Sequence, residues 1–116
     1  MGKQGKRNSE SYKLTIQQNY FNNLTDIVEY ISRIKKEPLS AIKVGQGINN
    51  AMKKIILNPT SYSECENIPT KSKIYREARY KSWLIIFKLK KSEIIILGVL
   101  NGKQKPSQFK QLKNKS

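Results

Sequence analysis

Histidine is missing from this 116-residue chain, and Cys65 is its only cysteine. A single cysteine cannot form an internal disulfide, and without histidine the chain lacks the usual nitrogen ligand of zinc. We therefore expect neither a metal site nor a cofactor. Long apolar runs are missing too: no stretch approaches the ~18 residues that span a bilayer, and the N-terminus lacks the apolar segment of a secretory signal. We expect a cytoplasmic protein with no membrane partner.

Acidic residues are scarce, 8 against 23 lysines and arginines, which gives a formal net charge of +15. The excess is uneven: residues 1–68 hold 10 basic and 6 acidic residues, a net +4, whereas residues 69–116 hold 13 and 2, a net +11. Each cation that neutralises a phosphate releases counterions, so such a surface favours nucleic acid, a ribosomal surface or an acidic protein as partner. The alternative is a surface that only keeps the protein soluble.

Residues 1–10 are polar and basic, and we expect them to form a flexible tail. Alternating apolar residues then predict a strand over residues 12–16. Two helices follow, over residues 20–35, with Asn19 as N-cap, and over residues 37–57, where Pro38 suits a first turn. Their apolar stripes comprise Phe21, Leu24, Ile27, Val28, Ile31 and Ile34 in the first helix, and Leu39, Ile42, Ile48, Met52, Ile55 and Ile56 in the second. Gly45 and Gly47 either allow a close helix approach or mark a kink.

A loop over residues 58–73 leads to three strands, predicted at residues 74–79, 83–89 and 93–100. Their short connections allow only antiparallel hairpins. The last two strands are apolar on nearly every residue, as expected of strands that are covered on both faces, or covered on one face and lining a groove on the other. Trp83 and Phe87 fit core packing better than base stacking. We predict an α+β fold of order β-α-α-β-β-β, a helical hairpin packed on a small antiparallel sheet. The domain spans residues 11–110, and residues 111–116 form a basic C-terminal tail.

The segment after the last strand is unusual for a simple turn. Residues 99–107 are VLNGKQKPS, so Asn101, Lys103 and Lys105 follow a buried strand directly. The amide can hydrogen-bond a phosphate or a base, and the lysines supply positive charge. The other interpretation is a turn that ends the sheet with its lysines in water.

This element order resembles the RelE/ParE family of toxins from type II toxin-antitoxin systems. The resemblance covers most of residues 12–109 and is carried by residues 75–106, YREARYKSWLIIFKLKKSEIIILGVLNGKQKP. In the family an arginine-bearing strand, an aromatic-rich strand, an apolar strand and a His-Gly-Lys/Arg corner follow in that order. The resemblance implies a growth-inhibiting toxin, of the kind that also serves plasmid stabilisation.

The resemblance also assigns site residues. Arg76 and Arg79 match arginines of the second strand, the latter lying near the scissile phosphate in RNA-cleaving members, and Lys103 matches the basic residue of the corner. Asn101 stands where many members have histidine, and Gln104 where some have arginine. The residue set expected to act on the substrate is Arg76, Arg79, Asn101 and Lys103, and the expected nucleic-acid contacts are Lys81, Lys105 and Lys110. Phe109 lies near the position of a catalytic tyrosine in some ribosome-dependent nucleases, but it has no hydroxyl.

RNA cleavage by the 2′-hydroxyl requires a base, an acid and cations that stabilise the charge on phosphorus. The base would have to be Glu77, Tyr75, Tyr80 or a lysine of lowered pKa. On one strand face Glu77 lies beside Arg79, which predicts a lowered carboxyl pKa and a poor base, or simply a surface ion pair. Catalysis by cations alone, with the ribosome aligning the substrate, is the remaining route.

The sequence therefore favours ribosome-dependent mRNA cleavage narrowly, and whether the chain is an endoribonuclease stays open. The alternatives are a ParE-like inhibitor of DNA gyrase, a degenerate toxin that only binds its antitoxin, and a basic module that binds nucleic acid. The implied partners are a small acidic antitoxin and either the ribosome with its mRNA or DNA gyrase.

Overall fold

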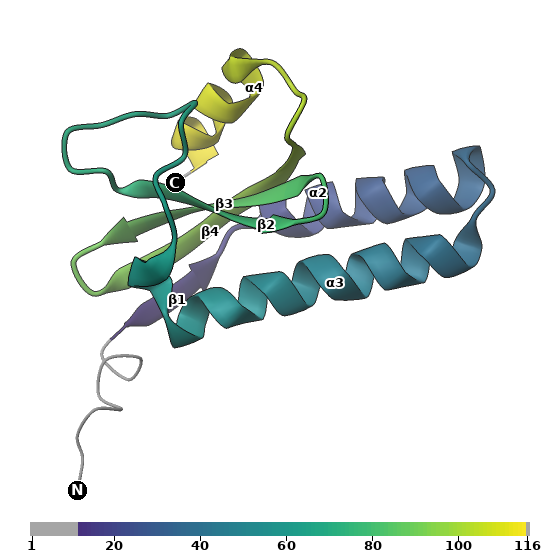
Figure 1. Cartoon of the computed structure of the whole chain (residues 1–116), viewed down its shortest axis with the longest axis horizontal. Helices are drawn as coiled ribbons and strands as arrows, with labels where there is room; N and C mark the ends of the chain where they lie inside the picture. Colours follow the sequence, from purple (N-terminus) through teal and green to yellow (C-terminus); the bar gives the residue numbers. More distant parts are fainter. Residues whose placement is uncertain (1–11, 116) are drawn as a thin grey trace, which may run out of the picture.

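The computed structural model describes residues 12–115, so the tail expected over residues 1–10 lies outside the described residues. The chain follows the predicted order and adds a short C-terminal helix (Figure 1). The elements are β1 (Lys13–Ile16), α2 (Gln18–Glu29), a π-helical turn (Tyr30–Ile34), α3 (Pro38–Leu57), a 3-10 turn (Pro59–Ser61), β2 (Tyr75–Tyr80), β3 (Trp83–Lys90), β4 (Glu93–Asn101), α4 (Pro106–Gln111) and a 3-10 turn (Leu112–Lys115).

The sheet has the strand order β1-β4-β3-β2. Strands β2, β3 and β4 form the predicted antiparallel meander. β1, however, pairs in parallel with β4, from Lys13 opposite Glu93 to Ile16 opposite Ile96, so the whole sheet is mixed rather than antiparallel. The long connection between β1 and β4 makes this possible, because parallel neighbours need a crossover and cannot be joined by a tight turn.

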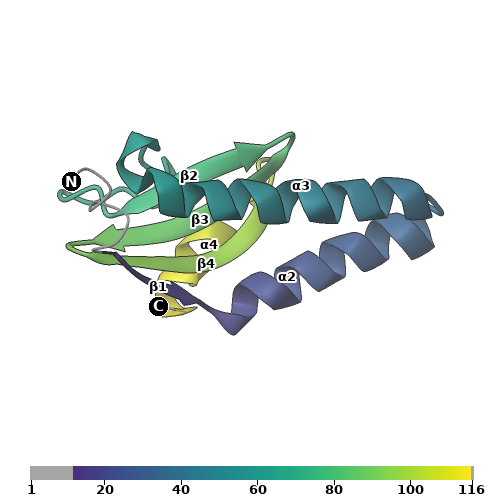
Figure 2. The ribbon, with the colours of Figure 1, turned by 90° about the horizontal axis from the view of Figure 1, so that it is seen from below.

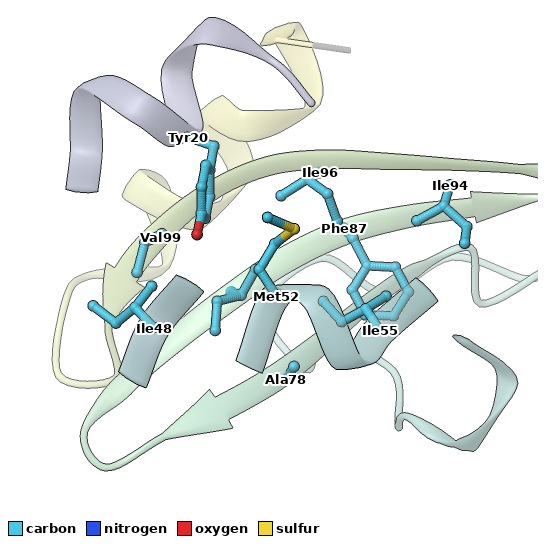
Figure 3. Close-up of a cluster of buried hydrophobic side chains, with 10 residues drawn as sticks. Tyr20, Ile48, Met52, Ile55, Ala78, Phe87, Ile94, Ile96 and Val99 are labelled. Carbon is cyan, nitrogen blue, oxygen red and sulfur yellow. The ribbon is translucent and has the colours of Figure 1, made fainter. Parts of the chain in front are cut away.

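Both faces of the sheet are covered, which explains why β3 and β4 are apolar on successive residues. On one face α2 and α3 bury Tyr20, Ile48, Met52 and Ile55 against the strands (Figure 3). Phe87 is fully buried there, and Trp83 packs at the margin, as expected for core residues. On the other face lies a second cluster that includes Cys65, Ile68, Tyr75, Leu84, Ile86, Leu97, Phe109 and Leu112.

The C-terminal segment belongs to this second layer. Phe109 is fully buried and Leu112 is 3% exposed. The packed part of the chain thus continues past residue 110, into the range that was expected to form a basic tail.

The glycines of α3 serve close packing and not a kink, since α3 runs unbroken from Pro38 to Leu57. A Cβ at Gly45 would lie 3.1 Å from Cγ2 of Val28 in α2, and a Cβ at Gly47 would overlap the ring of Tyr80 in β2. The two positions therefore set how closely α3 lies on α2 and on the sheet.

Asn19 does not cap α2, whose N-cap is Gln17. Instead, β1 ends at Ile16, and α2 takes over its hydrogen bonding to β4: Asn19 Nδ2 donates to the Leu97 carbonyl (3.0 Å), and the Val99 N–H donates to Asn23 Oδ1 (2.9 Å). Gly98 lies between these two bonds, and a Cβ there would lie 2.6 Å from Asn23 Oδ1. A larger residue would not fit at position 98, because the helix approaches the strand so closely.

The helical hairpin is longer than the sheet it covers, and its distal end extends past the strands (Figures 1 and 2). The apolar stripes predicted to be buried therefore run beyond the core: Ile34, Leu39 and Ile42 are 65%, 76% and 54% exposed. In the described part of the chain, no helix is long and apolar enough to cross a membrane.

Candidate functional site

The corner after β4 is organised by its own side chains. Asn101 Oδ1 accepts a hydrogen bond from the Lys103 N–H (2.9 Å), and the Asn101 N–H donates to Gln104 Oε1 (2.8 Å). The Gly102 N–H donates to the Ser82 carbonyl (2.8 Å), which ties the corner to the turn between β2 and β3. The Asn101 carboxamide oxygen is thus engaged in shaping the turn, a role that asparagine often takes next to its own backbone.

Arg79 reaches this corner from β2. Its side chain is exposed, and its Nη1 donates to the Lys81 carbonyl (3.3 Å). The same Nη1 would lie 3.8 Å from a Cβ at Gly102, so the guanidinium stands directly beside the corner. Lys81, in the turn, places its Nζ 5.6 Å from the ring centroid of Tyr80. We call Arg79, Lys81, Asn101 and Lys103 the basic corner.

Arg76 is not part of the basic corner. Alternation along β2 puts it on the opposite face from Arg79. Its Nε donates to the Lys73 carbonyl (3.2 Å), and its Nη1 donates to the carbonyls of Thr60 (3.2 Å) and Tyr62 (3.1 Å). The guanidinium therefore holds the loop before β2, and the structure separates Arg76 from the three other residues of the predicted active set.

The remaining predicted lysines divide between two places. Lys105 is exposed and follows the corner immediately, at the N-cap position of α4. Lys110, on α4, lies beside Ile68 and Pro69 of the loop that precedes β2. Only Lys105 is therefore placed to extend the positive surface of the basic corner.

Glu77 shares a strand face with Arg79 but does not form the expected ion pair: the salt bridge found among the described side chains joins Glu29 and Arg33 (4.0 Å). Burial raises the pKa of the Glu77 carboxyl, and this effect outweighs a hydrogen bond from the Cys65 thiol and the charge of Arg79, which lower the pKa. The expectation of a lowered pKa was wrong. No pattern in the sequence shows that the loop around Cys65 folds over this face and partly shields Glu77 from water.

The basic corner thus combines three basic side chains with an amide, and it contains no histidine and no carboxyl group. Phe109, expected near a catalytic aromatic position, is fully buried in the second core cluster. Within residues 12–115 no group of histidine, cysteine, aspartate or glutamate side chains could hold a metal ion. The arrangement is suited to binding an anion.

The comparisons with known proteins agree with the fold. Residues 14–106 match the family model described as the ParE toxin of the type II toxin-antitoxin system parDE. A search of curated proteins gave no match. Among solved structures, one titled "Chromosomal ParDE TA system from P. aeruginosa" is similar with a TM-score of 0.59 and 20% identity, covering 78% of this chain and 96% of that chain. Since the family model spans most of the sequence, the chain belongs to the ParE toxin family of type II toxin-antitoxin systems.

Proposed function

We propose that this toxin arrests growth by binding and inhibiting DNA gyrase in the cytoplasm, and that it does not cleave mRNA. The observation that carries the proposal is the composition of the basic corner, where Arg79, Lys81 and Lys103 stand around Asn101 in place of the histidine that many RelE/ParE-family members carry. The match to the ParE family supports the same choice.

The chemistry of RNA cleavage explains why this composition matters. Attack by a 2′-hydroxyl needs one group that accepts its proton and another that protonates the leaving oxygen. Asn101, where many RelE/ParE-family members carry histidine, can do neither, and its Oδ1 already accepts a hydrogen bond from the Lys103 N–H. Basic side chains that lack a neighbouring general base and general acid can bind a phosphate or a protein partner, but they do not supply the proton transfers that RNA cleavage needs.

Ribosome-dependent mRNA cleavage is the second candidate because of one observation on Glu77. This carboxyl lies two residues from Arg79 on the same strand face, and its pKa is raised by burial. A carboxyl of raised pKa is a better general base near neutral pH than an ordinary one. Cleavage would then depend on the ribosome presenting the phosphate between Glu77 and the basic corner.

An antitoxin partner is part of the proposal. The similar solved structure is titled as a ParDE toxin-antitoxin system, and residues 69–116 of this chain carry a net charge of +11. A small acidic antitoxin would neutralise this half of the chain, where repulsion between the cations is strongest.

The test compares the two targets directly. Purified protein is titrated into a supercoiling assay with gyrase, and mRNA ends are mapped in cells that express it. We expect supercoiling to be blocked and mRNA ends to be unchanged. Cleavage at specific codons with normal supercoiling would reject the proposal in favour of the second candidate.

The Arg79→Ala variant tests the basic corner itself. We expect it to relieve growth arrest while its melting temperature stays that of the parent protein, because Arg79 is exposed. Lys43→Ala, an exposed cation on α3, is the matched control and should remain toxic. Full toxicity of Arg79→Ala would remove the basic corner from the functional surface.

A further inference from the structure

The distal end of the helical hairpin is apolar although nothing in the fold covers it. We call Tyr30, Ile34, Leu39 and Ile42 the hairpin tip; their exposed fractions are 55%, 65%, 76% and 54%. They account for four of the seven exposed large hydrophobic side chains in the described part of the chain. A concentration of exposed apolar side chains within thirteen positions of a charged, basic protein indicates an interaction surface.

The hairpin tip does not serve the core. The hairpin side chains that pack on the sheet come from the proximal half, such as Tyr20, Ile48, Met52 and Ile55 (Figure 3). In the distal part, Ile31 and Ala41 are the buried side chains. The apolar periodicity of both helices nevertheless continues to the end of the hairpin, where it adds nothing to the packing against the sheet. These side chains are therefore available for burial against another molecule.

The charge around the tip differs from that of the rest of the chain. Residues 26–42 contain three acidic and three basic side chains, a net charge of zero in a chain of +15. Glu29 and Arg33 pair with each other at 4.0 Å. A polyanion or an acidic antitoxin is therefore drawn to the other half of the chain, and the tip fits a partner surface that is apolar and without strong net charge.

The shape of the hairpin tip favours a different protein over a second copy of this chain as its partner. The exposed side chains come from both arms of the hairpin, Tyr30 and Ile34 from the π-helical turn, Leu39 and Ile42 from α3, so the tip is a convex, finger-like end (Figure 2). Two such ends pressed together bury little surface, whereas a stable interface needs roughly 800 Å² from each partner. A recess can enclose the finger from several sides.

A hollow of ≈ 340 Å³ lies on the side of the hairpin that faces the sheet. Tyr30 lines it from the tip, Val44 from α3, and Trp83 and Asn101 from the sheet. The hollow connects the tip to the basic corner, so the rim of a recess that takes the tip can enter it and reach Asn101. This adds to the area that the partner buries.

From these observations we infer that the hairpin tip docks into an apolar, uncharged recess of the protein target that the toxin inhibits. This inference rests on the proposed function, in which that target is gyrase. The tip provides the contact area, and the neighbouring basic corner contacts the target beside the recess.

The experiment uses two variants with the same charge change on the same helix. Leu39→Glu alters the tip, and Leu57→Glu alters an equally exposed residue (76% and 75%) at the opposite end of α3. We expect Leu39→Glu to raise the concentration needed for half-inhibition of supercoiling by about tenfold or more, as for a central interface side chain. Leu57→Glu should leave it unchanged, and both variants should keep the parent melting temperature and the salt concentration at which the protein leaves heparin.

The results that would overturn the inference can be told apart. Equal inhibition by both variants overturns the inference, as does a heparin elution that shifts only in Leu39→Glu, which would make the tip a polyanion site. A parent dimer in sedimentation equilibrium that Leu39→Glu dissociates would make the occupant a second copy. If the parent protein does not inhibit gyrase, the proposed function fails separately. Growth arrest by the same two variants then tests the tip, which must lose toxicity only in Leu39→Glu.

Discussion

Two arginines of β2, three positions apart, have different surroundings. Arg76 donates to the carbonyls of Thr60, Tyr62 and Lys73, whereas Arg79 is exposed and donates to the single carbonyl of Lys81. The family resemblance placed the two in one catalytic set, although strand alternation puts them on opposite faces. Alternation shows which face each residue occupies but not what covers that face. The loop over residues 58–73, which lacks periodicity, decides the role of Arg76.

Arg76→Ala tests this difference through stability. Hydrogen bonds from a charged donor contribute more than neutral ones, so we expect the free energy of unfolding to fall by about 2 kcal/mol. Arg79→Ala should change it by less than about 0.5 kcal/mol. Urea unfolding of both variants measures the two values. Similar losses in the two proteins would mean that Arg76 does not hold the loop.

Glu77 makes the stability depend on pH. Its pKa is raised above the ordinary 4.5 in the folded protein. The folded state thus binds a proton that the unfolded state has already lost, and the free energy of unfolding falls as the pH rises from 4.5 through the folded pKa. Glu77→Gln removes this loss, so its melting temperature should exceed that of the parent at pH 7. The difference should shrink to nothing below pH 4.5, and a constant difference at every pH would contradict the role of the charge.

Helix α2 hydrogen-bonds to β4 where β1 no longer pairs with it. The side chains of Asn19 and Asn23 bond to β4 beyond the end of β1, and Gly98 allows the helix to come that close. Asn23→Ala leaves the N–H of Val99, a residue only 3% exposed, without its acceptor. An unpaired buried donor costs about 1–3 kcal/mol.

The matched control for Asn23→Ala is Asn22→Ala, one position earlier in α2. Asn22 is exposed and accepts a hydrogen bond only from Gln18 in the same helix. We expect its free energy of unfolding, measured in urea, to stay within about 0.5 kcal/mol of the parent value. If Asn22→Ala were as costly as Asn23→Ala, the loss would reflect helix propensity and not the bond to β4.

Periodicity predicted most elements because each helix and strand shows its pattern within a few residues. The meander and the hairpin followed from short turns and from apolar spacing. Pairings between distant segments were harder, since nothing near Lys13 in the sequence indicates that β1 runs parallel to β4. The extent of burial was also missed: Leu39 and Ile42 fit the helical stripe, but the sheet beneath ends before it reaches them.

The corner after β4 shows the same limit within the candidate site. The residue types predicted a polar, positively charged turn, and the structure places the guanidinium of Arg79 there, next to the backbone of Lys81 and beside the corner that contains Lys103. That Asn101 shapes the turn through its own carboxamide was not foreseen, because the same residue type fits a phosphate contact equally well.

Over the whole molecule, the two surfaces proposed to be functional carry opposite kinds of chemistry. The basic corner lies on the sheet, in the half of the chain with a net charge of +11, and the neutral apolar tip lies at the end of the hairpin that extends past the sheet. Long-range attraction is thus concentrated at one surface and short-range apolar contact at the other. A polyanion should respond to the first and ignore the second.

Salt dependence of binding to a short DNA duplex measures the charge of the basic corner. Each phosphate that a cation neutralises contributes about 0.9 to the slope of log K against log salt. We expect the double variant Lys81→Gln/Lys103→Gln to reduce that slope by about 2. The variant Lys43→Gln/Lys53→Gln, with the same loss of charge on exposed positions of α3, should leave it nearly unchanged. Equal slopes for the two variants would mean that DNA responds to the net charge of +15 as a whole, and the basic corner would then have no special place in binding a polyanion.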